Sequence, residues 1–447
     1  MAETASGDSG AMVVVERSTT GARAPQRPRV VIIGGGFAGL YAARALRRAR
    51  ATVTVLDRTN HHLFQPLLYQ VATAVLAPTD IISPIRHLLR TQENTSVLLS
   101  EVDRVDPARR VVISERGSRE TPYDYLVVAA GARHSYFAHP EWEALAPGLK
   151  SIDDARDIRE RFLMAFENAE KIGDVESQAA LLTFVIVGGG PTGVELAGML
   201  PDVIRKAMRK DFRRVDTDRA RVLLLEAGAR VLPAFPEELS RHARADLEQL
   251  GVEVRTGALV TRIERDAVHL GDERIAAHTV FWAAGNQASP LAQSLGAPLD
   301  QAGRVMVEAD LSVPGHPEIF VVGDLAAVHR ADGSLVPGVA PAAMQEGRSA
   351  ARNIIRNLRD EARKPFRYRD KGNLATIGRR KAVADFSGLH VTGRPAWWLW
   401  LFVHILYLAG FRNRLSVLVQ WAFAYFTYER GARLITQSGD AVPPSAH

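Results

Sequence analysis

Apolar residues along this chain gather in short β-branched runs that alternate with longer stretches at helical spacing. The runs VVII from Val30 and FVIV from Phe184 are each followed by three adjacent glycines and then by an apolar stretch rich in Ala and Leu. A continuous apolar run is typical of a strand buried on both faces, and apolar residues three and four apart are typical of a packed helix. The alternation predicts an α/β protein built on parallel sheets.

The same sequence motif occurs twice: VVIIGGGFAGLYAARAL from Val30 matches FVIVGGGPTGVELAGML from Phe184 almost position by position. In a GxGxxG pattern one glycine makes the strand-to-helix turn, one lets the backbone approach a pyrophosphate, and one lets helix and strand pack closely. Amides at the start of the following helix then hold the phosphates. The residues expected at these two dinucleotide sites are Gly34, Gly36, Phe37, Ala38 and Gly39 in the first copy, and Gly188, Gly190, Thr192 and Gly193 in the second.

An acid at the end of a second strand supports each site. Asp57, followed by Arg58, ends TVTVLD, and Glu226 ends RVLLLE. A carboxylate there receives ribose hydroxyls. The second interval is longer because a basic insert at 203–214, predicted to be helical, extends it. Two structural turns without a ligand are the alternative, and the paired acids argue against it.

Three later strands end in small residues. Small residues let the chain pass close to a bound cofactor. The strands YDYLVVAAGA, HTVFWAAGN and IFVVGDLA place Ala130 and Gly131, Ala284 and Gly285, and Gly323 and Asp324 at such ends. The Asp324 carboxylate is suited to a sugar or ribitol hydroxyl, but an Asp after a strand is often only the cap of the next helix. Taken alone, Asp324 favours the cap.

Composition narrows the chemistry. The 447 residues are 47% hydrophobic and 24% charged, as expected for a folded protein of two or three domains. The chain has no cysteine, which excludes disulfides, cysteine-ligated zinc, iron–sulfur clusters and CxxC redox pairs, so redox chemistry requires a bound organic cofactor. The net charge of +6 suits nucleotides, anionic lipid or nucleic acid. We recognise no nucleic-acid module, and because the adjacent His61 and His62 point to opposite sides, we predict no metal site.

The C-terminal region is dense in aromatic residues. Between Trp397 and Tyr428 lie 11 of the 31 aromatics of the chain. The stretch 396–409 is apolar except for His404 and is too short to span a bilayer. The stretch 415–428 is amphipathic: Ser416, Gln420, Ala424 and Thr427 form one narrow face beside a broad apolar surface, and arginines lie nearby. These features predict two helices that lie in one leaflet on an anionic lipid surface. Packing into the protein's own core or into a homodimer interface is the alternative.

Two dinucleotide fingerprints, two AAG strands and a late GD motif in this order resemble the flavoproteins with two dinucleotide-binding domains. The segments at 56–86, 337–347 and 366–389 are similar to type II NADH dehydrogenase, the non-pumping NADH:quinone oxidoreductase. The resemblance implies FAD at the first fingerprint, NADH at the second, Asp324 on the flavin ribitol, and electron transfer from NADH through FAD to a membrane quinone. Relatives that need a redox thiol beside the flavin are excluded by the missing cysteines.

The resemblance also implies residue roles. It places Glu195 beside the nicotinamide, where the alternative is an acid that only complements a helix dipole. It makes Gln345 quinone-contacting, while the first glutamine of the family pattern is replaced by Pro341, and it puts Lys371 near the flavin, where a solvated loop lysine is the alternative. The residues expected to shape the flavin pocket are Gln65, Pro66, Leu67, Ala343 and Met344. The helix that opens near Pro341 would aim its positive end at the flavin.

The predicted order is a disordered tail (1–27), an FAD domain in two parts (28–150 and 287–370), an inserted NADH domain (151–286), a membrane-anchoring region (371–435) and a second tail (436–447). Both dinucleotide domains are expected to be Rossmann-like. Glu226 favours NADH, although the nearby Arg230 leaves NADPH open. We expect a peripheral enzyme on the cytoplasmic face of the cell membrane. The alternatives are an FAD-dependent reductase of a soluble carrier such as a ferredoxin, and a non-enzymatic scaffold that binds FAD and NADH.

Overall fold

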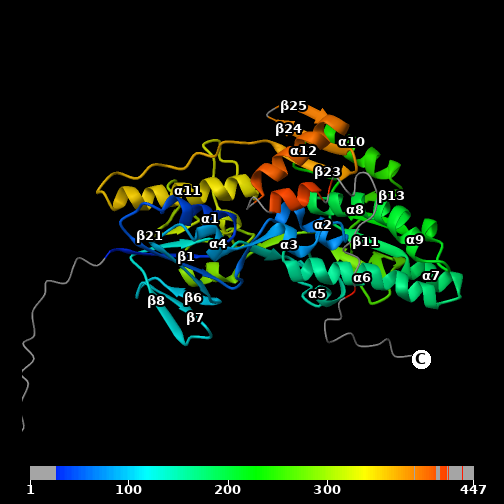
Figure 1. Cartoon of the computed structure of the whole chain (residues 1–447), viewed down its shortest axis with the longest axis horizontal. Coiled ribbons are helices and arrows are strands. Elements are labelled where there is room, and N and C mark those ends of the chain that lie inside the picture. Colours follow the sequence, from blue (N-terminus) through cyan, green and yellow to red (C-terminus); the bar gives the residue numbers. More distant parts are fainter. Residues whose placement is uncertain (1–26, 387, 409–412, 420, 422–434, 436–447) are drawn as a thin grey trace, which may run out of the picture.

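The computed structural model describes residues 27–386, 388–408, 413–419, 421 and 435. It has two parallel sheets side by side along the long axis, with the C-terminal elements over one face (Figure 1). The tails predicted at 1–27 and 436–447, apart from residue 27, lie outside the described residues, as does most of the range 415–428, which was predicted to be a second C-terminal helix.

The first sheet has the strand order β20-β21-β9-β1-β2-β5 and is parallel except for β20. Its strands are β1 (Arg29–Ile33), β2 (Thr52–Asp57), β5 (Thr95–Leu99), β9 (Tyr125–Val128), β20 (Ser312–Val313) and β21 (His316–Val321). Helices α1 (Phe37–Ala45) and α11 (Ala340–Asn357) can pack closely because residue 347 is glycine. A Cβ at that position would lie 2.1 Å from the carbonyl oxygen of Ala38. A meander follows β5: β6 (Val102–Asp106), β7 (Val111–Ser114) and β8 (Arg119–Pro122).

The second sheet repeats this plan. It has the order β13-β12-β11-β17, with β11 (Thr183–Val187), β12 (Arg221–Glu226), β13 (Val252–Thr256) and β17 (Thr279–Trp282), and all pairs are parallel. Its meander is β14 (Arg262–Ile263), β15 (Ala267–Leu270) and β16 (Glu273–Ala276). The longer helices of this half are α6 (Ile152–Lys171), α8 (Pro191–Val203) and α10 (Glu237–Gln249). The basic insert is helical as predicted, first as a π-helical segment (Ile204–Met208) and then as α9 (Arg209–Asp211).

The chain crosses between the two halves at an antiparallel strand pair. Strand β10 (Ala132–His134) pairs with β18 (Asn286–Ala288), so the entry to and the exit from the second half lie together. Helix α6 begins after the first crossing with a capping box, in which Ser151 and Asp154 bind each other's backbone N–H. The β10–β18 pair therefore joins the two dinucleotide-binding halves where the chain passes between them.

The C-terminal region begins with a sheet, which we did not predict. Strands β23 (Asn373–Gly378), β24 (Lys381–Phe386) and β25 (Leu389–Thr392) form an antiparallel sheet, followed by α12 (Gly393–Tyr407). This sheet packs on α8 at Gly198, where a Cβ would lie 1.6 Å from the carbonyl oxygen of Ile377. The C-terminal region is therefore built onto the second dinucleotide helix.

Short elements complete the fold: α2 (Leu68–Ala72), α3 (Pro78–Ile81), α4 (Ile85–Leu89), α5 (Trp142–Leu145), α7 (Val175–Leu181), β3 (His61–Leu63), β4 (Ile82–Pro84), β19 (Val305–Met306), β22 (Ala326–Ala327) and several 3-10 turns. Among the described residues, no helix is both long and apolar enough to cross a bilayer.

Candidate active site

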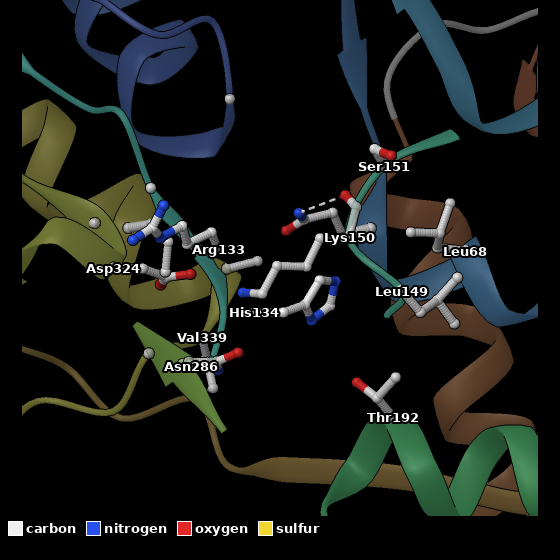
Figure 2. A pocket seen from close by; sticks show the side chains of 18 of the residues that line it. Leu68, Arg133, His134, Leu149, Lys150, Ser151, Thr192, Asn286, Asp324 and Val339 are labelled. Carbon is white, nitrogen blue, oxygen red and sulfur yellow. Dashed lines mark hydrogen bonds between the residues drawn. The ribbon is translucent and has the colours of Figure 1, made fainter. Parts of the chain in front are cut away.

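A large cavity of about 1760 Å³ lies between the two halves and is lined by residues of both. Its walls are the two glycine turns, the ends of β2, β9, β12, β17 and β21, the start of α11, and α12. Figure 2 shows residues from both halves facing one another across it, with Thr192 of α8 on one side and Asp324 on another. The two fingerprints, about 150 residues apart in sequence, therefore serve one site.

The glycines divide into the roles expected for the fingerprint. Gly34 has φ +96°, and a Cβ there would lie 2.3 Å from the carbonyl oxygen of Ala129. A Cβ at Gly39 would lie 1.8 Å from the carbonyl oxygen of Gly34, so this glycine lets α1 approach β1. Gly188 and Gly193 repeat both relations in the second half. Gly39 and Gly193 do not line the cavity themselves, so they act through packing.

The middle glycines open onto the cavity. A Cβ at Gly36 or Gly190 would meet nothing within 4 Å, and both residues line the cavity. They are the N-caps of α1 and α8, and neither helix has a side-chain cap or an acid in its first turn. Uncapped helix N-termini beside open backbone fit the pyrophosphates of FAD and of a nicotinamide nucleotide.

Both predicted acids, Asp57 and Glu226, line the cavity, and each accepts a hydrogen bond from a glycine turn. Asp57 accepts a hydrogen bond from the Gly35 N–H at 2.5 Å, and Glu226 accepts one from the Gly189 N–H at 2.6 Å. Each carboxylate also accepts from a later backbone N–H, that of Thr59 or that of Gly228. A carboxylate has about four acceptor sites, so both keep capacity for ribose hydroxyls while they fix the glycine turns.

The GD turn is not a helix cap. The short helix Gly323–Leu325 is capped by Val322, and Asp324 lines the cavity. Glu346 of α11, which sequence reasoning missed, accepts a hydrogen bond from the Gly323 N–H at 2.6 Å. Burial raises the pKa of Glu346 to about 7. The interpretation of Asp324 as a cap is therefore wrong, and its carboxylate is available to a ligand.

Lys150 was also missed, because a single lysine between the halves carries no motif. Its side chain extends into the cavity toward the side where Asp324 and Arg133 lie (Figure 2). Its backbone is held at both ends: its N–H donates to Asp154 at 2.8 Å, and its carbonyl accepts from Gln65 at 3.1 Å. Burial lowers the pKa of Lys150, while Asp324 and Asp154 favour its charged form. Lys150 is therefore close enough to Asp324 for the two side chains to interact electrostatically.

Glu195 lies on the cavity wall as the fifth residue of α8, which begins at Pro191. It therefore lies beyond the first helical turn, and this weakens the dipole alternative. Burial raises the pKa of the Glu195 carboxyl to about 8. The Thr376 backbone and the Trp400 indole act in the opposite direction, because they favour the ionised carboxylate, but their effect is smaller. The Trp400 indole N–H is buried and makes no hydrogen bond with any described residue, Glu195 included.

Helix α12 closes the cavity on one side. His404, Leu406 and Tyr407 line it. The His404 ring stacks on Trp400 at 4.2 Å, and its Nδ1 lies 2.7 Å from the Trp400 carbonyl oxygen. Burial lowers the pKa of His404 to about 4, so the imidazole is neutral at pH 7. The sequence had marked His404 only as a polar break in an apolar stretch.

Most of the predicted site residues line the cavity: Gly34, Gly36, Phe37, Ala38, Asp57, Arg58, Gln65, Pro66, Ala130, Gly131, Gly188, Gly190, Thr192, Glu195, Glu226, Ala284, Gly285, Gly323, Asp324, Ala343, Met344 and Lys371. Leu67 does not, because the short helix at Gln65–Leu67 turns its side chain into the core, and Leu68 faces the cavity instead. Lys371 is one of the residues that line the cavity.

Gln345 also lies outside the cavity lining. Its Nε2 donates to the carbonyl oxygens of Pro341 and Arg369, and its Oε1 accepts from the Arg369 N–H at 3.0 Å. The amide is thus committed to holding the backbone two residues before Lys371. Its direct contact with a quinone stays a prediction.

The paired histidines separate as expected. His62 is buried, with Nδ1 3.1 Å from the Gly35 carbonyl oxygen, while His61 lines the cavity. Within the described ranges, no group of three or more His, Cys, Asp or Glu could hold a metal ion.

Comparison with known proteins gives the family. Residues 28–347 match the pyridine nucleotide-disulphide oxidoreductase family, and residues 371–428 match the NDH2 C-terminal domain. The chain is 44% identical over 429 residues to the type II NADH:quinone oxidoreductase Ndh of Mycobacterium tuberculosis, covering 93% of this chain and 92% of that protein. It is 30% identical to the type II NADH:quinone oxidoreductase of Haemophilus influenzae, covering 80% and 87%.

A solved structure agrees in fold. The structure of NDH2 from Plasmodium falciparum in complex with NADH has a TM-score of 0.82 and 20% identity, covering 92% of this chain and 100% of that chain. The match confirms the α/β fold with two dinucleotide-binding domains, and the relatives confirm the use of FAD and NADH. With both fingerprints on one cavity and this similarity over nearly its whole length, the chain belongs to the type II NADH:quinone oxidoreductase family, a group of FAD-dependent, membrane-associated peripheral enzymes.

Proposed function

We propose that FAD binds at the first fingerprint and NADH at the second, and that a membrane quinone reaches the same cavity from the side of α12. The observation that carries this proposal is the shared cavity, because both fingerprints and α12 line it, so that the two nucleotides and the acceptor can bind next to one another. The bound FAD supplies the two-electron chemistry that the side chains lack. The domain limits of 28–150, 151–286, 287–370 and 371–435 are proposed with it.

In this proposal the backbone holds the nucleotides. The N-terminal amides of α1 and α8 bind the two pyrophosphates, and Asp57 and Glu226 accept ribose hydroxyls. Asp324 accepts a ribitol hydroxyl, with Lys150 beside it. The N-terminus of α11, whose Ala340 and Pro341 line the cavity, directs its positive end at the reduced, electron-rich cofactor.

Glu195 is proposed to orient the nicotinamide. With a pKa of about 8, its carboxyl is protonated at pH 7. A protonated carboxyl has both a donor and an acceptor, and so does the nicotinamide carboxamide. The neutral acid also avoids a negative charge near the flavin, which gains electrons in the reaction. Lys371 lies on the same cavity and is proposed to contact the flavin.

Glu226 is expected to make the enzyme prefer NADH over NADPH in kcat/KM. A carboxylate that accepts a ribose hydroxyl repels a 2′-phosphate, and Arg230 is turned to the Pro233 carbonyl oxygen at 3.0 Å. Glu226→Gln keeps an acceptor for the Gly189 N–H but removes the charge. The ratio of kcat/KM values should then fall by about tenfold toward NADPH. A wild-type enzyme that used both nucleotides equally would contradict the assignment.

The membrane proposal rests on the two faces of α12. Within α12, Ala396 and Trp400 are buried against the fold and lie four residues apart, on one face of the helix. Half a turn away, Trp398, Phe402 and Leu406 are 58%, 62% and 52% exposed. Core packing and lipid contact, which the sequence left as alternatives, thus suit opposite faces of one helix. Exposed Trp, Phe and Leu together fit the interface of an anionic bilayer.

Substituting Trp398, Phe402 and Leu406 together by serine is expected to release the protein from membranes. Each of these side chains loses at least about 1.5 kcal/mol of transfer free energy, so partition should weaken by about a hundredfold or more. Sedimentation with vesicles of phosphatidylglycerol and phosphatidylcholine measures this. Turnover with a short-chain quinone should persist when only Trp398 and Phe402 are substituted, because these two side chains, unlike Leu406, do not line the cavity.

A matched control substitutes Val175, Leu299 and Met306 by serine, three exposed apolar residues outside α12. This variant should sediment like the wild type. Equal vesicle binding by both triple variants would reject the lipid role of α12. If vesicle binding is unchanged while a wild-type dimer becomes a monomer, the face is a homodimer interface instead.

The membrane side is proposed to be the cytoplasmic face. Sealed vesicles of both orientations test this, because NADH does not cross a bilayer. Oxidation of added NADH should occur in inside-out vesicles and be absent from right-side-out ones. The reverse pattern would place the enzyme on the other face.

A further inference from the structure

Phe137 has an unusual backbone and an unusual exposure. Phe137 has φ +47° and Ala138 has φ +71°, so two consecutive residues with a Cβ are in the left-handed region. Such a conformation costs free energy and persists only where the surrounding structure enforces it. The Phe137 side chain is 61% exposed and lines the cavity, although its aromatic neighbours Tyr136 and Trp282 are only 8% and 3% exposed.

Hydrogen bonds of the two preceding residues, Ser135 and Tyr136, support this conformation. The Trp282 Nε1–H donates to the Ser135 carbonyl oxygen at 2.9 Å, and the Ser135 N–H donates to the Gly285 carbonyl oxygen at 3.3 Å. The Tyr136 hydroxyl donates to the Ala146 carbonyl oxygen at 3.0 Å, while its ring stacks on Trp282 at 5.1 Å. With Ser135 and Tyr136 held in this way, the left-handed backbone at Phe137 carries its ring to the cavity surface.

The ring lies at a defined place in the cavity. A Cβ at Gly285 would lie 2.5 Å from the Phe137 Cζ, so the ring rests on the glycine that follows β17. In the second sheet, β12 with Glu226 lies on one side of β11, and β17 lies on the other. The adenosine ribose belongs to the Glu226 side, so Phe137 stands on the opposite, nicotinamide half of the nucleotide site.

We propose that Phe137 is a positioning residue for the nicotinamide riboside of NADH, and the inference rests on the proposed binding of NADH at the second fingerprint. The ring is a flat apolar surface that contacts the nicotinamide half and removes water from it. A ligand that covers the ring returns the free energy of burying it, which offsets the strain at residues 137 and 138. The residue comes from the FAD half of the chain, so it also ties NADH placement to the crossing strands.

The test compares two ligands on the FAD-loaded, full-length enzyme. Isothermal titration with NAD⁺, which contains the nicotinamide riboside, and with ADP, which lacks it, gives two dissociation constants. Phe137→Ala should raise the Kd for NAD⁺ by about tenfold and leave the Kd for ADP within about twofold. Phe137→Leu should lie between. In turnover the KM for NADH should rise more than kcat falls.

Ala138→Gly is the matched control. It relieves the left-handed strain at the next position but keeps the aromatic ring, so the Kd for NAD⁺ should not rise. Bound FAD and the thermal unfolding temperature show whether each variant is folded. An unchanged Kd for NAD⁺ in Phe137→Ala overturns the inference, and so does an equal loss of ADP affinity. A wild-type enzyme that binds neither ligand instead overturns the placement of NADH.

Discussion

Gly39→Ala is expected to yield a folded protein that has lost its FAD and its yellow colour. A Cβ at position 39 would lie 1.8 Å from the carbonyl oxygen of Gly34, which is backbone and cannot rotate away. Helix α1 must shift by about 1 Å, and a misplacement of that size costs about a hundredfold in function. The visible spectrum, and a titration of the apoprotein with FAD, measure the loss.

Two matched glycines make this result specific. Gly193→Ala places the same clash, 1.9 Å from the Gly188 carbonyl oxygen, in the second half. It should retain FAD but lose NADH binding, the reverse of Gly39→Ala. At Gly173 a Cβ would meet nothing within 4 Å, so Gly173→Ala should behave as the wild type. Retained colour in Gly39→Ala would contradict the placement of FAD at the first fingerprint.

Glu195→Gln is expected to remove a pH dependence of NADH oxidation near pH 8, above which the wild-type rate should fall by about tenfold per pH unit. The wild-type carboxyl has a pKa of about 8, so its protonated fraction falls as the pH rises through that value. The amide keeps a donor and an acceptor but does not titrate. Steady-state rates between pH 6 and 9.5, with saturating short-chain quinone, should decline above pH 8 only in the wild type.

The same substitution should change stability with a defined sign. The folded protein holds the Glu195 proton up to a pH of about 8, whereas the unfolded chain releases it near 4.5. The unfolded state therefore binds fewer protons between these values, and the contribution of Glu195 to the free energy of unfolding falls as the pH rises through this window. Glu195→Gln should gain stability relative to the wild type at pH 9 compared with pH 5. Urea unfolding at both pH values measures it, and an equal difference at both would mean that the carboxyl is not shifted.

The nucleotide sites were the most predictable part of this molecule. A pyrophosphate turn requires glycine at fixed positions, so Gly34, Gly36 and their partners in the second copy are visible in the sequence as a pattern. The repeated strand order of the two sheets follows from the repeated motif. The GD motif was visible too, although only the structure showed that Val322, and not Asp324, is the cap.

Side-chain direction was not predictable where local geometry turns by one residue. Leu67 and Leu68 are equally apolar, and the short helix at Gln65–Leu67 decides that Leu68 faces the cavity. Gln345 has the expected residue type, but the backbone at Arg369 occupies its amide. The C-terminal sheet β23 to β25 was missed because its strands are held by packing on α8 and α12.

The sequence by itself determined that this chain carries two dinucleotide sites, has no thiol chemistry and has an aromatic C-terminal region, because these depend on residue type and local spacing. Tertiary structure alone decided which face of α12 is buried, that Lys150 and Phe137 enter the cavity, and that Glu195 is surrounded closely enough to raise its pKa to about 8. These properties depend on contacts between segments far apart in the chain, and local spacing carries no information about such contacts.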